Sequence, residues 1–210
     1  PVSGGIVLSY KCTSECRHCM YACSPHWKAD WILQKDLHRI LTQLSDRIQP
    51  SPLGHKRIDI NHGLHFTGGE PFLNFDLLVK AAEMAHELRI PSTFAETNSF
   101  WCTSDETTKE KLTRLRDAGL HGLLISVNPF ILEQVPFERT ERAIRVGRGV
   151  FGENAIVYQE VFYKRFRSLN LNCTLPFEEY LRMDPTGLAY AELLPMGRTV
   201  YKLEHLYTKY

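Results

Sequence analysis

Short runs of β-forming residues alternate with amphipathic helical stretches along the whole chain of 210 residues. This order predicts repeated βα units, in which parallel strands are joined by helices that pack on the sheet. The fold class we expect is therefore α/β. Six runs have strand character, namely residues 6–10, 58–66, 93–96, 122–127, 155–161 and 188–194.

Helical periodicity is clearest over residues 32–44, where apolar side chains recur every three or four positions. A second helix is predicted over residues 75–88. The next, over residues 103–119, opens with Thr103 and Glu106 in capping-box spacing and closes on Gly119, a residue that readily takes a left-handed cap. Further helices are predicted over residues 137–151 and 177–183, and from residue 200 onward.

The composition is that of one packed globular domain, with 43% hydrophobic and 11% aromatic residues and a formal net charge of +1. So balanced a charge gives no indication of a nucleic acid or an anionic membrane as partner. No apolar run is long enough to span a bilayer, and the first residues lack the pattern of a secretion signal. We therefore expect a cytoplasmic protein. Because the chain starts at Pro1, one interpretation is that it is a fragment of a longer protein.

Three cysteines follow the first predicted strand with the spacing C-x3-C-x2-C: Cys12, Cys16 and Cys19. A disulfide framework is one explanation, although three thiols cannot all pair among themselves. Structural zinc is another, with Cys23 or His26 as fourth ligand, but no second ligand pair follows. An iron–sulfur cluster fits better, because a short loop can place three thiolates around a cubane and leave one iron open.

A second motif, "FTGGEPF", ends the second predicted strand at residues 66–72. Adjacent glycines permit close approach of the backbone to a ligand or to another chain segment. Glu70 follows them with a carboxylate that suits a cationic group, and Pro71 stiffens the exit from the turn. An ordinary strand-to-helix turn is the alternative explanation. Both motifs follow strands, however, and the carboxyl ends of parallel strands share one face, where sites are built.

The loop "CTSECRHC" followed by "GGEP" resembles the radical S-adenosylmethionine (radical SAM) superfamily. The resemblance covers nearly the whole chain and implies a partial (β/α)6 TIM-like barrel with parallel strands, so that residues 1–210 form a radical SAM core domain. It also implies reductive cleavage of SAM at a [4Fe-4S] cluster, giving a 5′-deoxyadenosyl radical that abstracts hydrogen from a substrate. The implied partners are an electron donor such as ferredoxin or flavodoxin, and a substrate for which a peptide or protein is one candidate. A non-catalytic iron–sulfur or zinc module is the alternative function.

The resemblance also assigns roles to individual residues. Cys12, Cys16 and Cys19 would hold the cluster. His18 would lie against adenine, although a merely buried or solvated histidine is equally compatible. The Gly-Gly-Glu turn would receive the SAM amine, and Thr97 and Asn98 would lie at the cavity rim. For Ser126 a hydroxyl bonded within the core is equally compatible, and for Leu194 and Met196 packing is the favoured alternative. The candidate cofactor contacts are His18, Gly68, Gly69, Glu70, Pro71, Asn98, Ser126, Asn128 and Leu194.

Other residues receive weaker predictions. Cys23, Cys102 and Cys173 are expected to be idle buried cysteines. No protein acid or base is needed to form the radical, so substrate identity leaves little trace in the sequence. Alternation along the second strand would send His62 and His65 to opposite faces. The candidate residues on the substrate side are His62, His65, Asn98, Gln159 and Tyr163.

Overall fold

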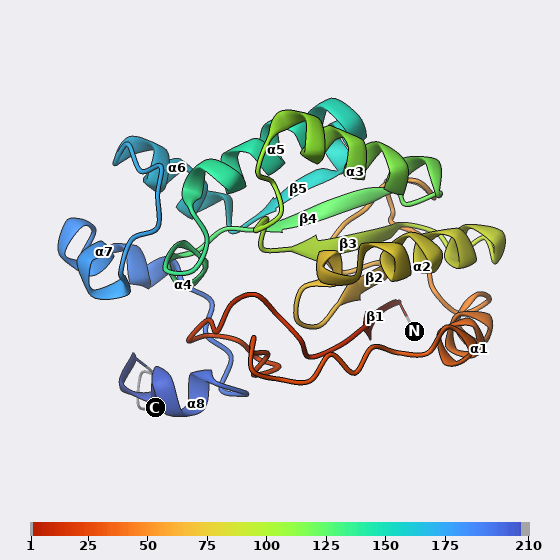
Figure 1. Cartoon of the computed structure of the whole chain (residues 1–210), viewed down its shortest axis with the longest axis horizontal. Helices are drawn as coiled ribbons and strands as arrows, with labels where there is room; N and C mark the ends of the chain where they lie inside the picture. Colours follow the sequence, from red (N-terminus) through yellow and green to blue (C-terminus); the bar gives the residue numbers. More distant parts are fainter. Residues whose placement is uncertain (1, 207–210) are drawn as a thin grey trace.

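A computed structural model describes residues 2–206 as a parallel sheet of five strands that lie in chain order, with helices alongside it (Figure 1). The outermost strands do not pair with each other, so the sheet is an open, partial barrel. This confirms the α/β class and the parallel arrangement. The strands are β1 (Ser3–Val7), β2 (Gly63–Thr67), β3 (Thr93–Thr97), β4 (Gly122–Ser126) and β5 (Ala155–Tyr158).

Helices connect the strands as the βα order predicts. Two of them, over residues 137–151 and 177–183, begin and end where the sequence predicts, and those over residues 34–44, 75–87, 105–117 and 199–202 differ from the predicted ends by a few residues. The helices over residues 129–132 and 160–168 were not predicted. The helices are α1 (Gln34–Leu44), α2 (Phe75–Glu87), α3 (Asp105–Asp117), α4 (Pro129–Leu132), α5 (Phe137–Phe151), α6 (Glu160–Ser168), α7 (Phe177–Met183) and α8 (Thr199–Lys202). Four short 3-10 turns complete the described chain: η1 (Pro71–Asn74), η2 (Gly152–Asn154), η3 (Gly187–Tyr190) and η4 (Glu204–Leu206).

The prediction of a sixth strand over residues 188–194 is wrong. This stretch forms η3 and an irregular segment, while β5 is the last strand of the described residues. The backbone N–H of Ala189 donates to Thr186 and that of Ala191 donates to Leu188. Because these groups are used within the turn, they are not free to extend the ladder beyond β5.

Two element ends differ from the sequence prediction for local reasons. The cap of α3 is Ser104 rather than Thr103, since the Ser104 hydroxyl accepts a hydrogen bond from the N–H of Thr107 at 3.2 Å. The second strand starts at Gly63 instead of residue 58, because residues 59–62 form a turn closed by an isolated bridge. Gly119 has a φ of +96° after α3, as a left-handed cap requires.

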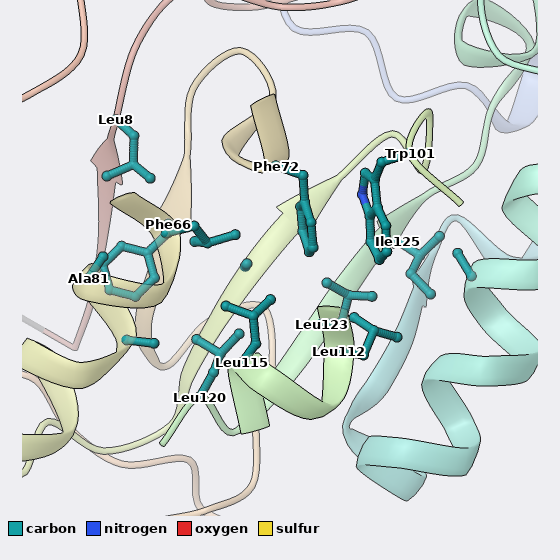
Figure 2. Close-up of a cluster of buried hydrophobic side chains, with 14 of the residues drawn as sticks. Leu8, Phe66, Phe72, Ala81, Trp101, Leu112, Leu115, Leu120, Leu123 and Ile125 are labelled. Carbon is teal, nitrogen blue, oxygen red and sulfur yellow. The ribbon is translucent and has the colours of Figure 1, made fainter. Parts of the chain in front are cut away.

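The main core lies between the helices and one face of the sheet (Figure 2). Alternate residues of the central strands point into it, including Phe66, Leu123 and Ile125. Phe72 from η1 stacks on Trp101 with ring centroids 4.1 Å apart. Phe94 and Leu124 belong to a smaller cluster that is separate from this core, as alternation along their strands requires. The helices therefore cover one face of the sheet, which leaves the carboxyl edge of the strands to the connecting loops.

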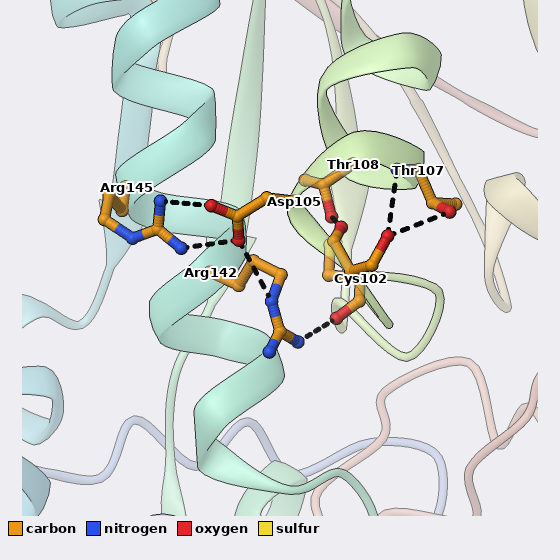
Figure 3. Close-up of polar contacts among 7 residues, drawn as sticks. Cys102, Asp105, Thr107, Thr108, Arg142 and Arg145 are labelled. Atoms are coloured by element: carbon orange, nitrogen blue, oxygen red, sulfur yellow. Dashed lines mark hydrogen bonds and ion pairs between the residues drawn. The ribbon is translucent and has the colours of Figure 1, made fainter.

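Polar contacts join α3 to α5 (Figure 3). Asp105 accepts hydrogen bonds from both terminal nitrogens of Arg145, at 2.7 and 2.6 Å. Arg142 lies 3.3 Å from the same carboxylate and donates to the carbonyl oxygen of Cys102 at 2.6 Å. Exposed pairs of this kind contribute little stability, because water screens the two charges. No helix in residues 2–206 is long and apolar enough to cross a membrane.

Candidate functional site

The loops at the carboxyl ends of the strands enclose a cavity of about 270 Å³. Its volume is near the lower end of the range of small-molecule sites. The loops after β1, β2 and β3 contribute one wall, and the ends of β4 and β5 contribute another. Residues predicted to form the site and found in this lining are Cys12, Cys16, His18, Cys19, Gly68, Gly69, Asn98, Ser126 and Leu194.

The cysteine loop forms part of the cavity wall. Cys12 and Cys16 are buried, Cys19 is partly exposed, and the loop is closed where the N–H of Cys19 donates to the carbonyl of Cys16 at 3.1 Å. Within residues 2–206, no three His, Cys, Asp or Glu side chains are grouped to hold a single metal ion. In a cubane each thiolate binds a different iron, so its ligands need not converge on one point.

Burial makes two of these thiols weak acids in the metal-free loop. It raises the pKa of Cys12 to about 12 and that of Cys16 well above its usual value. The pKa of Cys19 falls instead to about 6, chiefly because the Cys23 thiol donates a hydrogen bond to it. Bound iron favours the thiolate form. Three thiols on one cavity wall are the donor set that an iron–sulfur cluster needs, so these residues fit the group.

The glycine turn after β2 lies directly against the start of the cysteine loop. The N–H of Gly69 donates to the carbonyl of Ser9 at 2.8 Å, and the N–H of Glu70 donates to that of Lys11 at 3.1 Å. A Cβ atom on Gly69 would stand 1.9 Å from the Lys11 carbonyl oxygen, and Gly68 has a φ of +117°. Only glycines permit this approach, and it brings the two sequence motifs side by side.

Glu70 lies behind the cavity wall and is 1% exposed. Its carboxylate accepts hydrogen bonds from the Thr97 hydroxyl at 3.0 and 3.1 Å, and from the backbone N–H of Asn98 at 2.8 Å and of Phe72 at 3.2 Å. Pro71, also buried, starts η1. The structure thus brings neither Glu70 nor Pro71 into the cavity lining, and Glu70 instead joins the turn after β2 to the end of β3.

The titration of Glu70 gives a testable pH dependence. Burial raises its pKa from 4.5 to about 7, although its hydrogen-bond donors act in the opposite direction. Between these values the folded state binds more protons than the unfolded state. We therefore expect the free energy of unfolding to fall as pH rises from about 4.5 to about 7, by about 3 kcal/mol, and then to level off.

Urea unfolding of the wild type and of Glu70→Gln at a series of pH values measures this effect. The variant cannot titrate at this position, so its stability should vary less with pH over the same interval. Parallel pH profiles for the two proteins would contradict the assignment.

Asn98 reaches from the end of β3 to the cysteine loop. Its side-chain amide Nδ2 donates to the hydroxyls of Thr13 at 3.1 Å and Ser14 at 3.2 Å, and lies 3.8 Å from the Cys12 sulfur. Its Oδ1 accepts from the N–H of Phe100 at 3.0 Å. Asn98 therefore orients the loop that carries the first cysteine.

The His18 side chain has a defined tautomer. Asn128 Oδ1 accepts from the backbone N–H groups of Phe130 and Ile131, so its Nδ2 is the donor to His18 Nε2 at 3.1 Å. The proton of the neutral ring is then on Nδ1, a buried atom that has no hydrogen-bond partner among residues 2–206. Burial lowers the pKa of His18 to about 4, and the ring stacks on Phe130 at 4.8 Å.

Other predicted residues are placed in different ways. Cys23 is buried and lines the cavity beside Cys19, and Cys102 belongs to the main core. Cys173 is exposed, so the prediction that it is buried is wrong, because it lies in the irregular segment between α6 and α7. Gln159 lines the cavity in a left-handed conformation, with φ of 63°. Tyr163 packs against Phe137.

The two histidines before the glycine turn differ in environment. His62 precedes β2 and bonds Asp59 at 2.9 Å, while His65 contacts the ring of Phe94 and lies 3.6 Å from Glu96. Tyr163, His62, His65, Asn128 and Met196 are not brought into the cavity lining, although Asn128 contacts His18.

The cavity also contains residues that sequence reasoning missed. Glu96 follows Phe94 by two positions on β3, so strand alternation could have indicated it. Tyr158 ends β5 and its hydroxyl donates to the carboxylate of Glu192. Glu192 comes from the irregular segment after η3, and nothing local in the sequence indicates its position.

Five parallel strands with a three-cysteine loop and a glycine turn at their carboxyl edge define an α/β core that presents thiols to a small-molecule cavity. The sequence matches a family described as "4Fe-4S single cluster domain" over residues 5–129, more than half of its length. The chain therefore belongs to this family. No curated protein gives a match to the sequence.

Solved structures share the fold at low sequence identity. Native anSMEcpe with bound AdoMet (S-adenosylmethionine) is 14% identical, with a TM-score of 0.52 over 81% of this chain and 50% of that chain. BtrN in complex with AdoMet and 2-DOIA is 17% identical, with a TM-score of 0.50 over 74% and 55%. A further anSMEcpe structure holds AdoMet and the Cp18Cys peptide, with a TM-score of 0.50 at 14% identity, over 81% of this chain and 49% of that chain.

These findings agree with the fold and with the iron–sulfur cluster that the sequence predicts. The matching family is described by its 4Fe-4S cluster and the neighbouring structures hold AdoMet, the two cofactors that the sequence predicts. The chain spans about half the length of the solved chains that it matches.

Proposed function

We propose that this chain is the catalytic core of a radical SAM enzyme. The observation that carries the proposal is the shared cavity, where three closely spaced thiols face the same space as the glycine turn and Asn98. When the [4Fe-4S] cluster and AdoMet are both bound to the protein, the chemistry that they would supply is the reductive cleavage of AdoMet, followed by abstraction of hydrogen from a substrate. The reductant would be an electron donor such as ferredoxin or flavodoxin. The free cysteines suit a reducing compartment, which supports a cytoplasmic location.

Each side of the cavity has a role in this proposal. Cys12, Cys16 and Cys19 hold the cluster, and the backbone at Gly68 and Gly69 receives the methionine end of AdoMet. Groups from the cysteine loop, from the ends of β3 and β4 and from the segment after η3 orient the rest of the cofactor. The residues that we propose to do so are His18, Asn98, Ser126, Asn128 and Leu194, with Glu70 and Pro71 holding the glycine turn from behind.

The substrate would occupy the part of the cavity lined by the end of β5. Gln159 is the first candidate there, since a non-glycine residue in a left-handed conformation at a cavity is typical of functional positions. A peptide or protein is one candidate substrate. The anSMEcpe structure with the Cp18Cys peptide supports this class, whereas the 2-DOIA bound to BtrN points to a small molecule, so the shared fold alone does not choose between them.

The direct test is formation of 5′-deoxyadenosine. The protein is purified without oxygen, loaded with iron and sulfide, reduced with dithionite and given AdoMet, and the product is measured by chromatography. We expect product formation that depends on dithionite. A fully loaded, reducible sample that forms no product, and whose EPR spectrum AdoMet leaves unchanged, would contradict the proposal.

One observation favours a second function, a non-catalytic iron–sulfur or zinc module. The Cys23 thiol lies beside Cys19 on the same cavity wall and would complete a four-thiol set. Such a site would be closed to AdoMet. Stoichiometric zinc without iron, or a cluster that Cys23→Ser destroys, would favour this module, whereas a Cys23→Ser variant that keeps four irons would favour the enzyme.

A further inference from the structure

A segment far along the chain, Gly197, Arg198 and Thr199, lies against the cysteine loop. The backbone N–H of Arg198 donates to the carbonyl of Cys19 at 2.9 Å. Its guanidinium nitrogens donate to the carbonyls of Cys16 at 2.9 Å and Cys23 at 2.7 Å. One residue thus contacts three carbonyls of a loop that precedes it by 175 to 182 positions.

The two neighbours of Arg198 complete this contact. The Thr199 hydroxyl donates to the carbonyl of His18 at 3.0 Å. Gly197 has a φ of +60°, and a Cβ atom there would stand 2.4 Å from the Cys19 carbonyl oxygen and 2.3 Å from that of Met20. Only glycine allows so close an approach. Residues 197–199 therefore form a close and specific contact with the cysteine loop.

Arg198 brings a positive charge next to the thiols. Its side chain belongs to the buried residues, at 5% exposure, and it is not part of the cavity lining. The ion pair that it forms, with Glu15 at 3.6 Å, involves a side chain that is half exposed and hence well screened by water. The positive charge of Arg198 therefore acts mainly on the cysteine loop. A fixed charge of this sign favours a cluster that has gained an electron, and the effect is strong where water is excluded.

We propose that Arg198 is a positioning residue with two linked effects, to fix the cysteine loop through its carbonyls and to raise the reduction potential of the cluster held there. This rests on the proposed function in that it requires the cluster. It extends that function by assigning control of the electron-accepting step to a residue that contacts neither AdoMet nor substrate.

The test compares three variants of the full, cluster-loaded chain. Arg198→Gln removes the charge but keeps a donor, and Arg198→Lys keeps the charge but loses the fork of donors. Arg142→Gln is the matched control, because Arg142 also donates to a cysteine carbonyl, that of Cys102, but outside the cavity. The readouts are the midpoint potential, from a redox titration followed by EPR without AdoMet, and the iron retained after dilution.

We expect Arg198→Gln to favour the oxidised cluster at least tenfold, a shift of about 59 mV to more negative potential for one electron. Arg198→Lys should change the ratio of oxidised to reduced cluster less than threefold. The same variant should lose iron faster than the wild type. Arg142→Gln should match the wild type in both readouts. An Arg198→Gln potential equal to that of the wild type, or a lysine variant that shifts as far as the glutamine variant, would overturn the proposal.

Three further outcomes separate the proposal from the proposed function. If Arg198→Gln takes up no cluster, the lysine variant decides alone, and a tenfold shift in it overturns the proposal. A wild type that holds a cluster but does not cleave AdoMet removes the proposed activity and leaves this test intact, since the titration needs no AdoMet. A wild type that binds no iron–sulfur cluster overturns both.

Discussion

The Cys16→Ala variant is expected to lose the iron–sulfur cluster and, with it, all AdoMet cleavage. Cys16 is buried at the cavity and supplies one of three thiols, so its loss leaves one iron without a protein ligand. Mutation of a residue that only supports a metal ligand typically lowers metal affinity or activity 10–100-fold. Removal of the ligand itself should therefore lower them by about 100-fold or more. Iron and sulfide analysis, visible absorption and 5′-deoxyadenosine formation measure the loss.

Cys173→Ala is the matched control for this experiment. Cys173 is exposed and does not line the cavity, so the control should bind four irons and form product as the wild type does. Retention of four irons and of wild-type turnover in Cys16→Ala would show that this thiol is not a ligand.

The second large effect is expected from Gly69→Ala. The new methyl group would overlap the Lys11 carbonyl oxygen at 1.9 Å and also meet the backbone N of Cys12 at 3.0 Å. Backbone atoms cannot move aside as a flexible side chain can, so the glycine turn and the cysteine loop must separate. We expect the free energy of unfolding to fall by about 1–3 kcal/mol or more, with impaired cluster uptake. Urea unfolding and iron analysis measure these two effects.

Gly149→Ala controls for the loss of a glycine as such. Gly149 lies in α5, and no atom stands within 4 Å of a Cβ placed there. Alanine should therefore stabilise the helix by about 0.5–1 kcal/mol. A Gly69→Ala protein that unfolds and binds iron as the wild type does would contradict the close approach of the two motifs.

Local sequence patterns were sufficient to predict the βα order and to bring both motifs to one edge of the sheet. The cysteine spacing and the Gly-Gly pair predicted the cavity because each follows a strand, and parallel strands end on one face. Prediction was weaker where contacts are distant in the chain. The stretch 188–194 has strand composition, but its N–H groups bond within the turn, and composition does not show that.

The position of Glu70 shows the same difficulty at the site. Its place beside two glycines suggested a group open to a ligand, yet the side chain points to Thr97 and to the N–H of Asn98. Arg198 could not be identified because its partners precede it by about 180 residues in the sequence. Tertiary pairing of this kind has no short-range sequence signal.

The long separation between the cysteine loop and Arg198 has a consequence for biosynthesis. The loop is synthesised first, and the donors to its carbonyls follow about 175 residues later. At about 5–20 residues per second, the nascent loop waits roughly 10–40 s before those donors are synthesised. During this time its carbonyls at Cys16, Cys19 and Cys23 lack their native partner. Iron should therefore be delivered after Arg198 has been synthesised rather than to the loop as it first emerges.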